Sequence, residues 1–180
     1  MLNQISPLAP QPKSEDAVDL LIGCHQRIRH FTGVAIKLAH AQGAAPEEVV
    51  QAAAGAHRYY TISLPLHEAD EEETVRPRLN ALGDERLRHA LLAMTDQHQA
   101  IDDLLERLLP LLEMARNNPQ TIHAAGPEMC SITAALDEMF RAHLQLEEEA
   151  IFPAIQTLPE SARSDMLNEM RSRRQSGNPQ

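Results

Sequence analysis

The sequence predicts an all-α protein, an antiparallel up-down four-helix bundle with a short extra helix at its C-terminal end. Hydrophobic residues make up 43% of the 180 residues, but aromatic residues make up only 3% and Trp is absent. A core of Leu, Ala, Ile and Met suits packed helices better than stacked β-sheets, in which β-branched and aromatic residues are enriched. Turn signals also divide the chain into four long segments, and none of them shows the alternating pattern of a strand.

The first long helix is expected after residues 1–13, which contain three prolines and are predicted to form a flexible N-terminal arm. Ser14 is typical of a helix N-cap, and the acidic residues after it suit the positive end of the helix dipole. The helix should run to about His40, because Gly43 provides a C-terminal stop.

Three further long helices are expected, at about residues 46–75, 85–116 and 128–151. The second of the four helices begins at a proline, which is favoured in a first turn, and Pro65 is expected to bend it. Pro153 is expected to limit the fourth helix. Residues 14–157 would then form the bundle, and residues 158–180 would form a short helix and a basic polar tail.

The composition argues against several classes of partner. A formal net charge of −10 disfavours nucleic acid and anionic membranes. No apolar run approaches the ~18 residues that a membrane span needs, and the N-terminal segment lacks the apolar core of a signal peptide. The two cysteines, Cys24 and Cys130, have no paired spacing, so the simplest interpretation is a cytoplasmic protein with reduced thiols.

A repeat relates the two halves of the chain. Residues 67–77, HEADEEETVRP, and residues 143–153, HLQLEEEAIFP, place His, three consecutive Glu and Pro at matching positions. Upstream of each, His25 and His98 begin the similar segments HQRI and HQAI. Two similar helical hairpins packed face to face would have approximate two-fold symmetry, and each would bring the same groups to the middle of the bundle.

Helix geometry selects the residues that can act together. At ~100° per residue, positions i and i+4 share a face, so each repeated His points the same way as the Glu four residues later. Glu72 and Glu148 lie about 140° from these histidines and are expected to be solvated surface residues. The remaining histidines fail the same test and are expected at the surface or around the site: His30, His40, His57, His89 and His123.

The selected residues suit a metal site. A single His-x-x-x-Glu is most often a surface ion pair, but surface pairing gives no reason to duplicate His, Glu and Pro in register. Imidazole and carboxylate together bind iron or zinc, and a carboxylate can bridge two ions. We therefore expect two metal ions, each held by two histidines and bridged by Glu71 and Glu147. The candidate ligands are His25, His67, Glu71, His98, His143 and Glu147.

With these motifs, residues 15–155 resemble the hemerythrin-like, or HHE cation-binding, family. The resemblance implies a four-helix bundle that holds a non-haem di-iron centre, bridged by two carboxylates and an oxo or hydroxo group. It assigns the six candidate ligands to the same roles, one histidine from each helix and one bridging glutamate from the second and the fourth. Oxygen-carrying members have two histidines four apart on the third helix, whereas here Met94 and Asp102 flank His98 at that spacing.

The resemblance implies a protein that binds or reacts with oxygen, nitric oxide or peroxide. The alternative is an iron-handling or redox- or oxygen-sensing module without catalytic turnover, and a metal-free helical adaptor is the third possibility. The same ligands would accept zinc or manganese. The sequence leaves open whether the protein is an enzyme, and it leaves the oligomeric state open.

Overall fold

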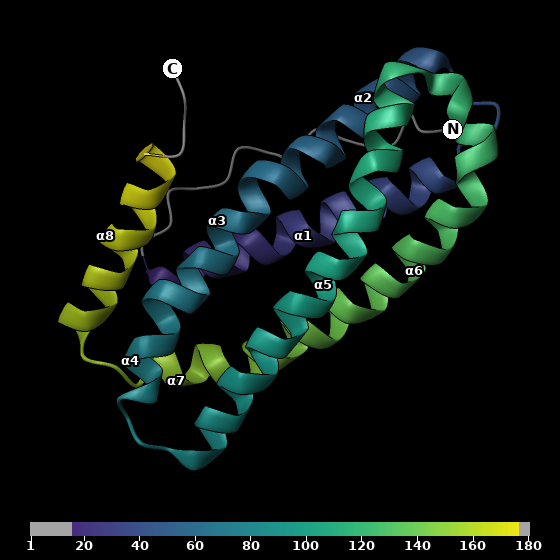
Figure 1. The fold of residues 1–180 in the computed structure, drawn as a ribbon. Helices are drawn as coiled ribbons and strands as arrows, with labels where there is room; N and C mark the ends of the chain where they lie inside the picture. Colours follow the sequence, from purple (N-terminus) through teal and green to yellow (C-terminus); the bar gives the residue numbers. More distant parts are fainter. Residues whose placement is uncertain (1–15, 177–180) are drawn as a thin grey trace.

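The computed structural model describes residues 16–176, and every regular element in that range is helical (Figure 1). The α-helices are α1 (Ala17–Ala39), α2 (Pro46–Arg58), α3 (Leu64–Ala69), α4 (Arg76–Asn80), α5 (Glu85–Asn117), α6 (Ile122–Leu146), α7 (Phe152–Gln156) and α8 (Glu160–Ser176). The shorter elements are the π-helical turns η1 (Tyr59–Ser63), η2 (Asp70–Val75) and η4 (Glu147–Ile151), and the 3₁₀ turn η3 (Pro119–Thr121).

These elements form four rods: α1, then α2 to α4, then α5, then α6 with α7. Both α1 and α5 pack against α2 and α6, so consecutive rods are neighbours (Figure 1). This is the up-down arrangement of a four-helix bundle. The predicted fold class, including the extra C-terminal helix, is confirmed.

Side-chain caps start two of the rods. The carboxylate of Asp16 accepts a hydrogen bond from the backbone N–H of Val18 at 2.9 Å, so Asp16 is the N-cap of α1. The expected cap Ser14 and the expected arm 1–13 lie outside the described residues. Asp84 caps α5 in the same way by accepting from the N–H of Leu87 at 3.0 Å.

The π-helical turns let two rods continue through proline. The sequence predicted that the second rod ends near Val75 and the fourth at Ile151, and both predictions are wrong. In each π turn the last donor bonds the carbonyl five residues back, and Pro65, Pro77 and Pro153 directly follow these donors. The wider turn accommodates a ring that lacks an N–H and would otherwise clash with the carbonyl four residues earlier.

The core consists of two apolar clusters along the bundle axis. One cluster contains Leu64, Ile101 and Phe140, and the other contains Met94 and Ile151. The repeated His and Glu residues occur between members of the two clusters along each rod. They are buried even though they are polar. A polar layer therefore crosses an otherwise apolar interior.

The C-terminal helix is more extensive than the sequence suggested. The expected polar tail is helical as far as Ser176, and Met166 and Met170 are fully buried in the second cluster. Arg173 and Arg174 both form ion pairs with the buried carboxylate of Asp70, and Arg174 Nη2 lies 2.6 Å from Asp70 Oδ2. These ion pairs therefore hold the last turns of α8 against η2.

Replacing both Arg173 and Arg174 with Ala should leave the Asp70 carboxylate buried without a counter-ion. We expect a loss of about 2–3 kcal/mol in unfolding free energy, below the upper range for a buried pair because the guanidiniums are partly exposed. Urea denaturation measures this change. Arg86→Ala, at an exposed position, is the control and should change stability little. Equal effects in both proteins would show that the ion pairs contribute nothing.

Candidate metal centre

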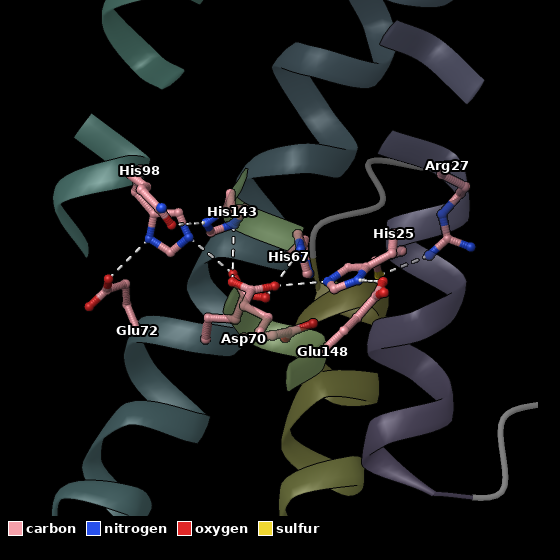
Figure 2. Close-up of polar contacts among 12 residues, drawn as sticks. His25, Arg27, His67, Asp70, Glu72, His98, His143 and Glu148 are labelled. Atoms are coloured by element: carbon pink, nitrogen blue, oxygen red, sulfur yellow. Dashed lines mark hydrogen bonds and ion pairs between the residues drawn. The ribbon is translucent and has the colours of Figure 1, made fainter. Parts of the chain in front are cut away.

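Four histidines and two glutamates meet in the polar layer, with one histidine from each rod (Figure 2). The six residues are His25, His67, Glu71, His98, His143 and Glu147, and none is more than 7% exposed. They are the six candidate ligands that the sequence predicted. The structure brings all of them together.

Each carboxylate lies between imidazoles from two rods. Glu71 Oε1 is 3.1 Å from Nε2 of His67 on the same rod, and Oε2 is 3.1 Å from Nε2 of His98 on α5. Glu147 Oε1 is 3.0 Å from Nε2 of His143, and Oε2 is 2.8 Å from Nε2 of His25 on α1. The i, i+4 spacing therefore sets one contact of each glutamate, and the packing of the rods sets the other.

These contacts define two overlapping groups that can each hold a metal ion. One group contains His25 and His67, the other contains His98 and His143, and both include Glu71 and Glu147. Within each group, one ligand atom per residue lies within 4.8 Å of all the others. Ligands at ~2.0–2.2 Å from a common ion are separated by up to about 4.4 Å, so each group is close to the size of a coordination sphere.

Several buried atoms in the site lack hydrogen-bond partners within the protein. His67 Nε2, Glu71 Oε1 and Glu147 Oε1 are in this state although each lies close to another polar atom. His67 Nε2 lies 3.1 Å from Glu71 Oε1, and Glu147 Oε1 lies 3.0 Å from His143 Nε2, but neither pair has hydrogen-bond geometry. Because an unpaired buried polar atom is costly, such a set fits a cation placed between its members.

Burial shifts the acid–base properties of the site. Desolvation, with a smaller contribution from neighbouring carboxylates, raises the pKa of Glu71 well above its usual value, and desolvation and Glu71 raise the pKa of Glu147 to about 8. Desolvation and neighbouring imidazoles lower the pKa values of His67 and His143. These two imidazoles are therefore neutral at pH 7, whereas the carboxyl groups hold protons that a metal ion must displace.

Glu148 is exposed, as the sequence suggested, and Glu72 is half-buried, but both also contact histidines of the site. Glu148 Oε1 lies 2.8 Å from Nδ1 of His25, and Glu72 Oε1 lies 3.1 Å from Nδ1 of His98 (Figure 2). Because these glutamates point away from the histidine on their own rod, they face a histidine on the next rod. A carboxylate that accepts a hydrogen bond from Nδ1–H leaves Nε2 free to coordinate.

A third contact to Nδ1, the ring nitrogen on the outer side of a site histidine, comes from a residue that the sequence did not single out. Gln97 Oε1 lies 3.1 Å from Nδ1 of His143. The sequence could have pointed to Gln97 only through its position immediately before His98. Helix periodicity alone does not show which rod Gln97 faces. The histidines expected outside the site, His30, His40, His57, His89 and His123, belong to neither metal-sized group.

The fold and the site together define a helical-bundle protein with a buried cluster of histidines and carboxylates suited to metal ions. The hemerythrin HHE cation-binding domain matches residues 16–155, and the chain belongs to this family. A comparison with curated proteins found no match. Membership of the family implies metal-ion binding, for which the six-residue cluster has the required donors.

Glutamate substitutions should reveal a graded order of metal affinity. Glu71→Ala and Glu147→Ala remove donors shared by both groups and should abolish tight binding. Glu72→Ala and Glu148→Ala remove only outer hydrogen bonds and should weaken binding about 10–100-fold. Glu149→Ala, at an exposed position of the same acidic run, is the control and should have no effect. Competition with a chelator measures each constant, and equal losses at positions 147, 148 and 149 would refute this geometry.

Metal should raise the melting temperature more at pH 8 than at pH 5.5. The raised pKa values of Glu71 and Glu147 mean that the metal-free folded protein keeps these protons as pH rises above the unfolded value of ~4.5. The metal-free protein therefore loses stability toward pH 8, where displacing the protons becomes easy. In acid the histidines of the unfolded chain take up protons that the buried histidines do not, which destabilises loaded and metal-free protein to the same extent. This contribution therefore cancels in the difference between the two melting temperatures. Identical curves at pH 8 would contradict metal binding in this layer.

Proposed function

We propose that the protein holds two iron ions, bridged by Glu71 and Glu147, and that it binds or reacts with a small ligand such as oxygen, nitric oxide or peroxide. The observation that carries this proposal is the sharing of both glutamates by two metal-sized groups. A site for a single ion needs only one such group. The duplication of His, Glu and Pro in the sequence has the same explanation.

The ligand set supports iron as the natural metal. Two imidazoles and two bridging carboxylates per ion form a mixed nitrogen and oxygen environment that suits a redox-active metal, although zinc and manganese also fit. Four protein donors leave coordination positions for an exogenous ligand. When bound, the iron pair would supply the capacity to give up and take back electrons and to bind a small molecule directly.

A small pocket beside the site supports a small ligand. It has a volume of about 10 Å³, and its lining includes His67, His98 and His143 together with the apolar side chains of Leu64 and Ile101. A space of this size is at the lower limit for a single water-sized molecule and excludes a metabolite. On the opposite side, the ring of Phe152 stacks on His25 with centroids 4.9 Å apart and covers that imidazole. The pocket therefore favours approach from the side of His67, His98 and His143, away from His25.

The protein's own residues would do three things for this chemistry. Glu72, Glu148 and Gln97 would hold imidazole rings in the tautomer that presents Nε2 to the metal. Leu64 and Ile101 would exclude bulk water from the ligand. The two bridging glutamates would release their protons when metal enters and take them up when metal leaves.

The second candidate function is an iron-handling or sensing module without turnover. The contact between α8 and η2 favours it, because Arg173 and Arg174 bind Asp70, the residue immediately before Glu71. A change in the charge at Glu71 would therefore alter the electrostatic interaction between Asp70 and helix α8 at the surface of the bundle. The match to the family ends at residue 155, so α8 lies beyond it.

We propose a cytoplasmic location and no nucleic-acid or membrane partner. The support is the net charge of −10 and the two free cysteines, Cys24 and Cys130. Among residues 16–176, no helix is both long enough and apolar enough to cross a bilayer.

Iron analysis of protein loaded anaerobically with Fe(II) tests the proposed centre. We expect two irons per chain, and a single iron at saturation would refute the bridged pair.

Leu64→Phe tests the pocket, because it installs the aromatic residue found at the matching position of the other repeat, Phe140. This variant should keep both irons and react more slowly with oxygen, nitric oxide or peroxide, followed by the change in near-ultraviolet absorption. Leu64→Ala should react faster, and no spectral change with any of the three ligands would favour the module without turnover.

A further inference from the structure

The outer hydrogen bonds of the site follow the two-fold repeat of the sequence. Glu148 supports His25, and its counterpart Glu72 supports His98, with each glutamate reaching a histidine on the neighbouring rod. Each glutamate is anchored in turn by an arginine. Arg29 lies 2.7 Å from Glu148, and Arg76 lies 2.6 Å from Glu72. Both histidines therefore have a carboxylate partner at Nδ1, and Thr95 donates a further hydrogen bond to Glu72 Oε1 at 2.7 Å.

The symmetry fails at the other two histidines. Gln97, which precedes His98, supports His143 by accepting a hydrogen bond from Nδ1–H. The residue in the matching position, before His25, is Cys24. Nδ1 of His67 is buried and has no hydrogen-bond partner among the described residues, although the side chain is only 2% exposed. Three of the four imidazoles thus have a hydrogen-bond partner at Nδ1, whereas His67 has none in the part of the chain that the structure describes.

Cys24 is engaged elsewhere. Arg27 Nη2 donates to its sulfur at 3.0 Å, and Arg174 Nη2 donates to it at 3.4 Å. Arg174 is held in this position by its ion pair with Asp70. The thiol, a weak acceptor at best, therefore contacts two guanidinium groups instead of the ring of His67. Helix α8 thus takes part in the difference between the two halves of the site.

We propose that the two metal positions are unequal, and that the position at His98 and His143 binds its ion more tightly than the position at His25 and His67. Loss of one outer partner of a ligating histidine typically lowers metal affinity about 10–100-fold. The bridging glutamates are common to both positions, so they do not offset this difference. The weaker ion is the one that exchanges with the surroundings, and the small pocket is lined by both histidines of the tighter position and by His67 of the weaker one.

This inference rests on the proposed two-metal centre, and it identifies Gln97 as a positioning residue. Gln97 would not touch the metal, and it would act by fixing the ring of His143. Removing its acceptor oxygen should therefore weaken only the tighter position. Cys24 has no contact with His67 that could be removed, so a change at Cys24 should not weaken the other position in the same way.

Filling the metal-free protein with zinc, followed by NMR of the imidazole nitrogens, tests the order of occupation. With one equivalent of zinc, the Nε2 signals of His98 and His143 should move to the range of metal-coordinated nitrogen, while those of His25 and His67 should remain outside that range. The second equivalent should change the remaining pair. First occupation of His25 and His67, or equal occupation of both positions, would overturn the proposed inequality while leaving the two-metal centre intact. Saturation at one zinc, or no response, would refute the centre itself.

Variants at Gln97 separate positioning from simple structural support. Gln97→Leu keeps the approximate volume but removes the acceptor, and it should weaken the first zinc-binding step about 10–100-fold in a chelator competition. Gln97→Glu restores an acceptor and should restore the first step. Cys24→Ala is the matched control and should leave both steps unchanged. Melting of the metal-free variants checks that each is folded, and a first step that is the same in the Leu and Glu variants would overturn the role of Gln97.

Discussion

Burial of six ionisable groups in one layer is the constraint on which the rest of the structure depends. Four imidazoles and two carboxylates occupy an interior between two apolar clusters, and none is more than 7% exposed. Such a layer is costly when its members are charged and unpaired. The raised carboxyl pKa values and lowered pKa values of His67 and His143 are how the metal-free protein limits this cost. A metal ion would limit it in another way, by pairing with the ionised carboxylates.

The surrounding helices are arranged to hold this layer in register. The π-helical turns η2 and η4 contain the two glutamates that both groups share, and each turn is followed by a proline through which the rod continues. Local widening of a helix is often found at functional sites, because it adjusts the direction of a side chain without ending the helix. The same device appears in both halves of the bundle, which agrees with the two-fold repeat.

The departures from symmetry show where the two halves of the site differ in structure. The small pocket is lined by His67, His98 and His143, whereas Phe152 covers His25. Gln97 in one half is replaced by Cys24 in the other, and Cys24 contacts an arginine from α8. A helix beyond the family match thus contacts a residue next to one histidine of the site.

The sequence by itself determined the fold class, the number of rods and the six residues that meet in the centre. It succeeded because helix periodicity is local, so the positions of His67 and Glu71 on one face follow from their spacing alone. Tertiary structure decided what lies opposite each face. Glu72 and Glu148 point away from the histidines of their own rods, and only the rotation and register of neighbouring rods bring them to His98 and His25. The position of α8 and the unpartnered nitrogen of His67 depend in the same way on contacts between residues far apart in the chain.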